Sequence, residues 1–345
     1  MKRIGNLWPK IVSFDNLLLA YYKARKGKKQ RDAVAAFSLN LEQELLDLQY
    51  QLVNGCYVPG AYRQFIIRER KPRLISAAPF VVRVVHHAVM NVLEPILDKR
   101  FYYHSYACRK NKGVHKAVDQ YQIWAKQYSY VLKLDIRRYF PSICHPQLKL
   151  QLARIIKDNK LLSLLTLIID ASPSPEKGIG LPIGNLTSQY FANLYLNNID
   201  LWICQQPAAK AYIRYVDDMI VLGNNKQALW QFKRKLEVEL KILGLVIHKS
   251  KQQLMRTTER VDILGYKISQ NRRWLRSDNG IRFQRKLRKF ANSYQQGLLE
   301  WQDFKPSVMS WIGHAKHGET LGLKKAIFRR CTFNSTSDPA RDTHE

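Results

Sequence analysis

Two adjacent aspartates stand between two short apolar runs in the second half of the chain. Residues 212–216 read YIRYV and residues 219–222 read MIVL, so the segment predicts two strands joined near Asp217 and Asp218. Neighbouring carboxylates repel each other and resist burial, and therefore need water, a basic partner or a divalent cation. A solvated turn is the simplest explanation of such a pair. A third acidic residue at the end of another predicted strand favours a metal site instead.

That third acid is Asp135, which ends the β-prone run VLKL of residues 131–134. Carboxylates gathered from the ends of two neighbouring strands can hold two Mg²⁺ ions roughly 3.5–4 Å apart, and such a pair supports both the attacking and the leaving oxygen in phosphoryl transfer. Asp135, Asp217 and Asp218 are therefore the predicted catalytic residues and metal ligands. The pattern indicates nucleotidyl transfer.

The charge of the chain indicates a polyanionic partner. Its 345 residues include 57 Lys and Arg against 27 Asp and Glu, a formal net charge of +30. Nucleic acid is the first candidate and a membrane surface is the rival. No apolar run approaches the ~20 residues of a spanning helix, and no secretory segment follows the start, so we expect a cytoplasmic protein without a membrane partner. The five scattered cysteines predict neither a disulfide framework nor a zinc site.

Across roughly residues 63–325, the order and spacing of these motifs resemble the reverse transcriptases, whose palm carries an aspartate strand and a Tyr-x-Asp-Asp hairpin. The resemblance implies an α+β right-hand polymerase fold with fingers, a palm built on an antiparallel sheet, and a helical thumb. It implies two Mg²⁺ ions, with Mn²⁺ as the alternative, and the backbone carbonyl of Ile136 as a further ligand. The expected parts are a helical extension (1–60), fingers (61–125, with part of 141–185), palm (126–270), thumb (271–333) and a flexible tail (334–345).

The resemblance also implies residues that bind the incoming nucleotide. Lys71 and Arg73, in a predicted hairpin, take the place of the fingers residues that clamp the triphosphate, although a hairpin tip can carry such residues for solubility alone. Phe140 takes the place of an aromatic gate that excludes the 2′-hydroxyl, with a core aromatic as the alternative. Lys251 is expected to protonate or neutralise the leaving pyrophosphate, unless it is one exposed lysine among many.

A glycine-rich turn lies between the two carboxylate segments. Residues 181–189 read LPIGNLTSQ, where most of the family has Gln-Gly-x-x-x-Ser-Pro, so Ile183 stands in place of the glutamine and Gln189 in place of the proline. Gly184 would let the backbone approach the nucleotide closely. This version of the turn resembles that of reverse transcriptases from diversity-generating retroelements. Those enzymes misincorporate at the adenines of a template RNA, and the mutated cDNA replaces a variable region of a target gene.

Isoleucine offers a physical reason for such errors. It is stiff at its first torsion and has no polar atom, so Ile183 cannot donate a hydrogen bond that fixes the base pair or the sugar. Losing one such constraint costs discrimination of about 1–3 kcal/mol, or roughly tenfold to more than a hundredfold. Ile183 and Gln189 are therefore the predicted fidelity residues. The alternative is that Ile183 only packs beneath the turn.

Further positions are expected to hold the template and primer. Residues 261–266 (VDILGY) resemble the primer-gripping hairpin, with Leu264, Gly265 and Tyr266 as its grip. Basic residues before the palm and in the thumb are expected to contact nucleic acid, although basic side chains are also common on solvated surfaces. They are Arg83, Lys110, Lys112, Arg272, Arg273, Arg282, Arg285, Lys286 and Lys289.

Taken together, these motifs predict an RNA-directed DNA polymerase that copies a template RNA into cDNA, with errors at adenines that diversify a variable gene region. The implied partners are template RNA, the cDNA/RNA duplex, deoxynucleoside triphosphates and a basic, oligomeric accessory variability protein. We expect no room for ribonuclease H, integrase or endonuclease segments. A retron or group II intron-like enzyme without adenine mutagenesis is the alternative, although it would usually keep the glutamine turn. An RNA-binding protein with a decayed site would have lost some of the three acids.

Overall fold

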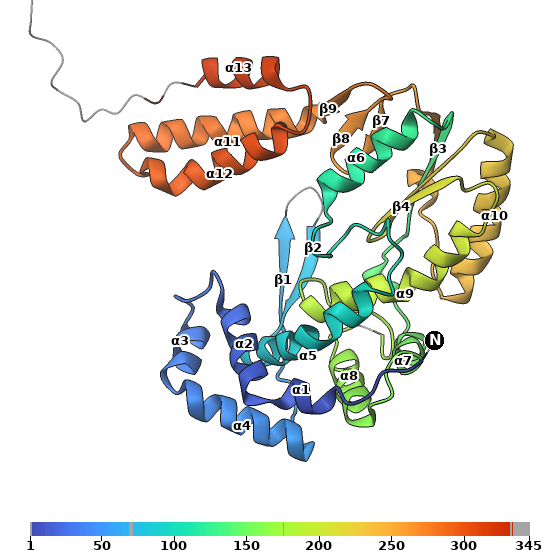
Figure 1. Cartoon of the computed structure of the whole chain (residues 1–345). Helices are drawn as coiled ribbons and strands as arrows, with labels where there is room; N and C mark the ends of the chain where they lie inside the picture. The colour runs from blue at the N-terminus through green and yellow to red at the C-terminus, as the bar shows by residue number, and fades with distance from the viewer. Residues whose placement is uncertain (1, 69–71, 175, 332, 334–345) are drawn as a thin grey trace, which may run out of the picture. The chain divides into compact units, whose positions relative to one another are not determined.

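The computed structural model describes residues 2–68, 72–174, 176–331 and 333 (Figure 1). Lys71 and the expected tail 334–345 lie outside the described residues. The chain divides into two compact units. The first unit consists of Met1–Gly113, Lys133–Val221 and Lys226–Gln253. The second consists of Val114–Leu132, Leu222–Asn225 and Leu254–Glu345. The division into fingers, palm and thumb stays a prediction.

The first unit begins with helices and a hairpin. The helices are α1 (Trp8–Val12), α2 (Phe14–Arg25), α3 (Asp32–Leu39) and α4 (Leu41–Asn54). Ser13 caps α2, and Gly55, at φ +73°, ends α4 in the left-handed conformation that glycine adopts without strain. Strands β1 (Arg63–Arg68) and β2 (Pro72–Ala77) pair antiparallel, and in Figure 1 they rise from the layer of helices that contains α5. The hairpin expected at this place is confirmed.

Helix α5 (Phe80–Asp98) is the central helix of this region and contacts α1, α2 and α9. It is apolar because it is largely enclosed, with Val84, Val85 and Val89 fully buried. By length and composition alone it is long and apolar enough to cross a membrane, so the expectation that no apolar run approaches the length of a spanning helix was wrong. More than half of it is buried within the protein, as in the core helix of a globular domain.

The middle of the chain builds a four-stranded sheet and the helices around it. The sheet runs in the order β4-β5-β3-β6, so the two strands that carry the acids, β3 and β5, are neighbours. Its strands are β3 (Tyr130–Asp135), β4 (Ala211–Tyr215), β5 (Asp218–Gly223) and β6 (Gln253–Arg256). The helices are α6 (Val114–Ala125), η1 (Phe140–Ser142), α7 (His145–Ala153), α8 (Asn159–Asp170), α9 (Leu186–Cys204), α10 (Lys226–Ile242) and η2 (Lys249–Lys251).

The second unit contains a three-stranded antiparallel sheet followed by three helices. The strands are β7 (Val261–Ile263), β8 (Tyr266–Ile268) and β9 (Arg273–Leu275), and the helices are α11 (Ser277–Gln295), α12 (Trp301–Ala315) and α13 (Leu321–Arg329). Helix α11 contacts both α12 and α13. Phe283 and Trp311 stack between α11 and α12 with ring centroids 3.9 Å apart. Aromatic side chains therefore form the core of this helical group.

Candidate active site

The structure confirms the hairpin predicted around the paired aspartates. Strands β4 and β5 are joined through Val216 and Asp217, and Asp218 begins β5. Val216 has φ +56°, as expected for the first central residue of a type II′ turn. A β-branched residue adopts this conformation only at a cost of about 1–3 kcal/mol, so surrounding contacts must hold the turn. Strain of this kind is concentrated at functional sites.

Backbone hydrogen bonds bring the third aspartate to this turn. The amide of Ile136 donates to the carbonyl oxygen of Asp217 at 3.2 Å. On its other side, Asp135 accepts at its own carbonyl from the amide of His248 at 2.7 Å. The end of β3 is thus fixed between the aspartate turn and the segment before η2. The sequence-distant acids Asp135 and Asp217 therefore meet at one place.

The electrostatics of this place are those of crowded carboxylates. Burial, followed by the neighbouring charge of Asp218, raises the pKa of Asp217 to about 6, and Asp135 adds to the rise while Lys251 opposes it. The Lys251 ammonium lies 2.5 Å from each carboxylate oxygen of Asp135. Lys251 therefore reaches the acid cluster directly, rather than standing as an isolated surface lysine.

Within the described residues, no three His, Cys, Asp or Glu side chains are grouped closely enough to hold a metal ion as they stand. Lys251 instead supplies the positive charge beside Asp135. An added cation would nevertheless offset both the burial and the repulsion that raise the pKa of Asp217, and hard carboxylate oxygens are the ligands that Mg²⁺ prefers. Asp135, Asp217 and Asp218 thus offer the type of oxygen ligand that a divalent ion binds, although their side chains are not gathered around one point in this structure.

A buried ion pair behind the turn was not identified from the sequence. Arg214 on β4 is 0% exposed, and its Nε donates to both carboxylate oxygens of Asp200 on α9 at 2.8 Å. Its remaining donors reach Asn193 and, at 3.2 Å, the carbonyl oxygen of Val216. The guanidinium therefore braces the strained residue next to Asp217. An arginine within the apolar run YIRYV was the available signal, since a buried charge must be paired.

The glycine-rich turn lies against two other predicted nucleotide-site segments. The amide of Leu181 donates to the carbonyl of Phe140 at 2.9 Å, and the carbonyl of Ile183 accepts from the amide of Ser76 on β2 at 3.3 Å. Gly184 has φ +109°, and a Cβ there would lie 3.2 Å from the Ile75 side chain. Glycine is thus required at residue 184 both by its conformation and by the close approach of β2.

The other predicted nucleotide-site residues differ in their surroundings. The Phe140 ring is partly buried and meets the ring of Tyr139 edge-on, with centroids 5.8 Å apart. Gln189 is partly buried near the start of α9, and Arg73 is exposed on β2 opposite Ile67. Their roles stay predictions.

The residues of the first unit that are expected to contact nucleic acid lie in different environments. Burial and the nearby Arg31 lower the pKa of Arg83 on α5. Lys110 is exposed. Lys112 lies over the ring of Tyr103, with its Nζ 3.4 Å from the ring centroid, and donates to the Tyr103 carbonyl. Lys112 therefore contributes to the structure of its own loop.

In the second unit, the residues predicted to grip the primer form a tight hairpin. Leu264 and Gly265 have φ +46° and +100°, the two positive values that a type I′ turn requires. The Tyr266 hydroxyl is 3.1 Å from His115 Nε2 and 2.9 Å from His314 Nδ1. These contacts connect the hairpin to helices α6 and α12. The confirmed feature is the hairpin, and its grip on a primer stays a prediction.

The basic residues of the second unit are of two kinds. Arg282, Arg285, Lys286 and Lys289 are exposed along α11. Arg272 is also exposed. Arg273 instead donates to Asp119 and Gln122, both at 2.8 Å, so its guanidinium has protein partners. The exposed face of α11 is the better candidate for phosphate contacts.

The sequence of this chain is similar to those of a known protein family. The sequence profile described as reverse transcriptase (RNA-dependent DNA polymerase) matches residues 67–268. Similar curated proteins include the putative COX1/OXI3 intron 1 protein of Saccharomyces cerevisiae, at 25% identity over 54% of this chain and 30% of that protein. Protein YkfC of Escherichia coli is 24% identical over 54% of this chain and 61% of that protein. The group II intron-encoded protein LtrA of Lactococcus lactis is 24% identical over 71% of this chain and 42% of that protein. The chain thus spans between about a third and three fifths of these relatives.

Solved structures give a matching result for the fold. The apo telomerase of Candida tropicalis, truncated from its C-terminal domain, aligns with a TM-score of 0.50 and 14% identity over 63% of this chain and 55% of that chain. Telomerase from Candida albicans, in complex with a fragment of telomeric RNA, aligns with a TM-score of 0.50 and 12% identity over 80% and 57%. These alignments confirm the predicted right-hand polymerase fold.

Proposed function

The chain belongs to the reverse transcriptase family, and from that membership we propose that it is an RNA-directed DNA polymerase with its active site at Asp135, Asp217 and Asp218. The observation that carries the proposal is the hydrogen bond from Ile136 to the Asp217 carbonyl, which places the end of β3 at the aspartate turn. Extension of a DNA primer on an RNA template by the purified protein tests it.

We propose that the three aspartates, with the backbone carbonyl of Ile136, hold two Mg²⁺ ions, or Mn²⁺ in their place. When bound, these ions would activate the primer hydroxyl and stabilise the charge on the reacting phosphate and the pyrophosphate. The ionised form of Asp217 is the form that binds a cation, and its raised pKa makes this form pH-sensitive. Lys251 forms an ion pair with Asp135, and we infer that it neutralises the leaving pyrophosphate once a cation occupies that carboxylate.

The remaining residues of the site orient the nucleotide. The missing side chain of Gly184 lets β2 approach the turn, and we infer that the base pair lies against the exposed backbone of this glycine. Phe140 is held next to this segment by the bond from Leu181 to its carbonyl. We infer that the Phe140 ring lies beneath the sugar and excludes the 2′-hydroxyl. Arg73, on the adjoining strand, contacts the triphosphate together with Lys71.

The Phe140 assignment predicts a change in sugar selectivity. Phe140→Ala should admit ribonucleotides, raising their incorporation relative to deoxynucleotides by roughly tenfold or more, because the ring that clashes with the 2′-hydroxyl is removed. Primer extension with mixed nucleotide pools, followed by alkaline cleavage of the product, measures this ratio. Phe140→Tyr keeps the ring and is the matched control. Continued exclusion of ribonucleotides by Phe140→Ala would assign Phe140 to packing.

We propose that the enzyme copies with errors at template adenines and serves to diversify a variable gene region. The support is the turn sequence, in which Ile183 and Gln189 replace the glutamine and proline of most of the family. A group II intron-like enzyme without adenine mutagenesis is the second candidate, favoured by the similarity to LtrA. The two candidates differ in the errors found in the cDNA.

The proposed cause of these errors can be tested at one side chain. Ile183→Gln should lower misincorporation opposite adenine by roughly tenfold to a hundredfold, since an amide that fixes the pairing nucleotide restores about 1–3 kcal/mol of discrimination. Sequencing of cDNA made on a defined RNA measures the error at each base. Ile183→Leu keeps the aliphatic character and should keep the errors. An unchanged adenine error rate in Ile183→Gln would remove this explanation.

The proposed partners follow from the same function. They are a template RNA, the growing cDNA/RNA duplex and deoxynucleoside triphosphates, together with a basic, oligomeric accessory variability protein, in the cytoplasm. The exposed basic residues of α11 support the duplex assignment, because phosphate contacts need accessible Lys and Arg side chains.

A further inference from the structure

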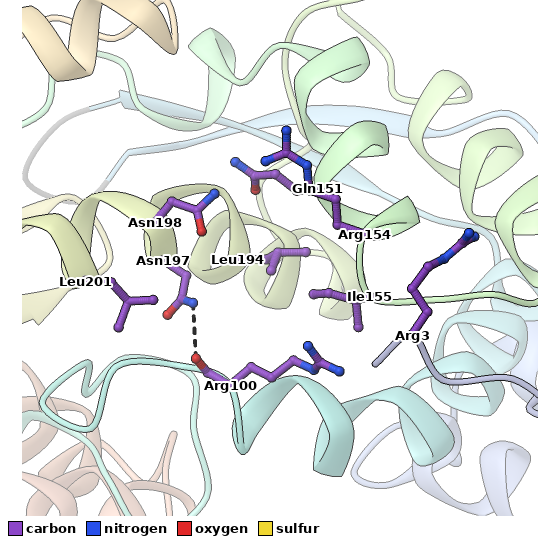
Figure 2. A pocket seen from close by; sticks show the side chains of 9 residues that line it. All are labelled: Arg3, Arg100, Gln151, Arg154, Ile155, Leu194, Asn197, Asn198 and Leu201. Atoms are coloured by element: carbon purple, nitrogen blue, oxygen red, sulfur yellow. Dashed lines mark hydrogen bonds between the residues drawn. The ribbon is translucent and has the colours of Figure 1, made fainter. Parts of the chain in front are cut away.

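A cavity of about 490 Å³ in the first unit is lined by three arginines and by none of the residues assigned to the active site (Figure 2). The arginines are Arg3, Arg100 and Arg154. Amide side chains join them, and apolar residues complete the wall. The full lining comprises Arg3, Arg100, Gln151, Arg154, Ile155, Leu194, Asn197, Asn198 and Leu201.

No acidic residue is among the described residues that line this cavity, so the lining itself carries only positive charge. Arg3 donates through Nε and one terminal nitrogen to the carbonyl of Ile156, at 3.1 and 2.8 Å. Arg100 donates to the carbonyl of Lys2 at 3.3 Å. A carbonyl oxygen orients the Arg3 guanidinium but does not cancel its net charge. With the exposed Arg154 in the same lining, the cavity can therefore attract an anion.

The position of Arg3 is built into the fold. Ile4 pairs with Ile156 in a parallel bridge, and its carbonyl accepts from the amide of Lys157 at 2.7 Å. The segment before α1 is therefore tied to the connection between α7 and α8. An arginine on such a fixed segment loses less conformational freedom on binding than one on a free terminus.

A second cavity, of about 640 Å³, shares Arg100 with the first. Lys10 and Lys99 also line it, and again no acidic residue is among the described lining residues. The two hollows together are lined by five cationic residues, which come from the N-terminal segment, the end of α5 and the end of α7. The cationic residues of one hollow would be enough to bind a single phosphate group. Because cationic residues line both adjoining hollows, a polymer with repeated negative charges fits them better than a single phosphate does.

We propose that these two hollows, here called the arginine groove, bind the phosphate backbone of RNA outside the stretch being copied. The proposal rests on the proposed function, which requires the enzyme to hold an RNA, and adds a second contact with it. Asn198 favours RNA over another polyanion, because its amide is exposed in the lining and can form hydrogen bonds with a ribose 2′-hydroxyl.

The decisive variant is Arg154→Glu. Arg154 is exposed, and the described residues give its side chain no ion pair or hydrogen bond, so the change should leave the fold intact. The probe is a long RNA with stem-loops flanking its template segment. At physiological salt, Arg154→Glu should weaken its binding about tenfold, and the slope of log affinity against log salt should fall by at least about 0.7, the value of one lost phosphate contact on a single strand.

Arg234→Glu is the matched control, because Arg234 is an exposed arginine on α10 and lines neither hollow. It should bind the long RNA more tightly than Arg154→Glu does. A short duplex of RNA template and DNA primer, which contacts only the copying site, should be bound and extended by Arg154→Glu as by the wild type. Equal binding of the long RNA by the two variants would overturn the arginine groove.

A triple variant strengthens the test. Arg3→Ala/Arg100→Ala/Arg154→Ala should reduce the salt slope by about 2, for three lost contacts, if thermal unfolding shows that it is folded. Because binding is measured separately from synthesis, a wild-type protein that binds the long RNA in this groove but makes no DNA would refute the proposed function and leave the groove standing. A folded triple variant with an unchanged salt slope would refute the groove alone.

Discussion

Replacing Asp217 with asparagine is expected to reduce DNA synthesis by about 10³-fold or more while leaving binding of the template–primer duplex unchanged. Asparagine preserves the size of the side chain but cannot provide the negative charge that the reaction needs at the turn. In the proposed function, duplex affinity depends instead on basic surfaces such as the exposed face of α11. Single-turnover extension and equilibrium binding of the same duplex separate the two effects. Synthesis at the wild-type rate would contradict the assignment of Asp217.

The same change is expected to stabilise the protein. Burial and the neighbouring Asp218 raise the pKa of Asp217 to about 6 from the ordinary 3.8, so the folded state binds this proton more tightly than the unfolded state does. The charged carboxylate therefore destabilises the fold above pH 6, and this penalty disappears as the pH falls toward 4. At pH 8 the difference corresponds to about 3 kcal/mol. The neutral amide of the Asp217→Asn variant carries no such charge and avoids the penalty.

Urea unfolding at pH 8 and at pH 5, in the presence of a chelator, measures this effect. Asp217→Asn should be more stable than the wild type at pH 8, and the gap should shrink at pH 5, where the wild-type carboxyl is largely protonated. Asp15→Asn changes an exposed acid at the start of α2 and should show little difference at either pH. An equal gap at the two pH values would show that Asp217 is not the crowded, buried group described above.

Breaking the buried pair of Arg214 and Asp200 is expected to have the second large effect. Asp200→Leu should destabilise the fold by about 3–5 kcal/mol, because it leaves the Arg214 charge buried without its partner. Arg214→Met should do the same to Asp200. Thermal or urea unfolding measures both losses. A cost below about 1 kcal/mol would mean that the pair is hydrated or loosely packed.

The double variant Arg214→Met/Asp200→Leu separates stability from positioning. Replacing both charges with apolar side chains of similar size often restores stability, so most of the loss should be recovered. Synthesis should stay low, because the carbonyl of Val216 no longer has the arginine donor that braces the turn. A lowered kcat with an unchanged KM for the nucleotide is the expected signature. Full recovery of kcat in the double variant would assign the pair to stability alone.

Adding Val216→Gly to that double variant tests the role of strain. Valine adopts φ +56° only when it is held there, whereas glycine adopts it freely. The glycine should therefore restore part of the lost kcat, since the turn no longer depends on the brace. In an otherwise wild-type protein the same change should have little effect on kcat. No rescue by Val216→Gly would indicate that Arg214 positions some other part of the site.

Local patterns predicted the elements that hold the active site. The apolar runs around the paired aspartates predicted the hairpin that joins β4 and β5. A glycine-specific backbone was predicted at Gly184, but its close neighbour in the structure is Ile75, and its approach to the nucleotide stays a prediction. These features depend on short stretches of chain, so a sequence pattern is enough to find them. The meeting of Asp135 with Asp217 depends on strand order, which a local pattern does not determine. The position of Asp135 at the end of a predicted strand suggested this meeting, and the resemblance to a family supported it.

Sequence patterns did not predict the contacts between residues that are distant along the chain. Lys251 could be read either as a reagent or as a surface lysine, and only the structure places its ammonium on Asp135. Arg214 looked like one residue of a strand, and its partner Asp200 lies on the preceding helix. The arginine groove joins Arg3, Arg100 and Arg154 through pairing of the N-terminal segment with Ile156, for which the sequence carries no periodic signal.

We propose that carboxylates from β3 and the aspartate turn act together in RNA-templated DNA synthesis. Extension of a labelled DNA primer on a defined RNA template by the purified protein with Mg²⁺, compared with Asp135→Asn and Asp217→Asn, tests this proposal. We expect a product whose sequence is complementary to the RNA, apart from errors opposite adenines, and no product from either variant. A wild-type protein that binds this duplex without extending it, or a variant that extends it as well as the wild type, would show that these carboxylates do not carry out the synthesis.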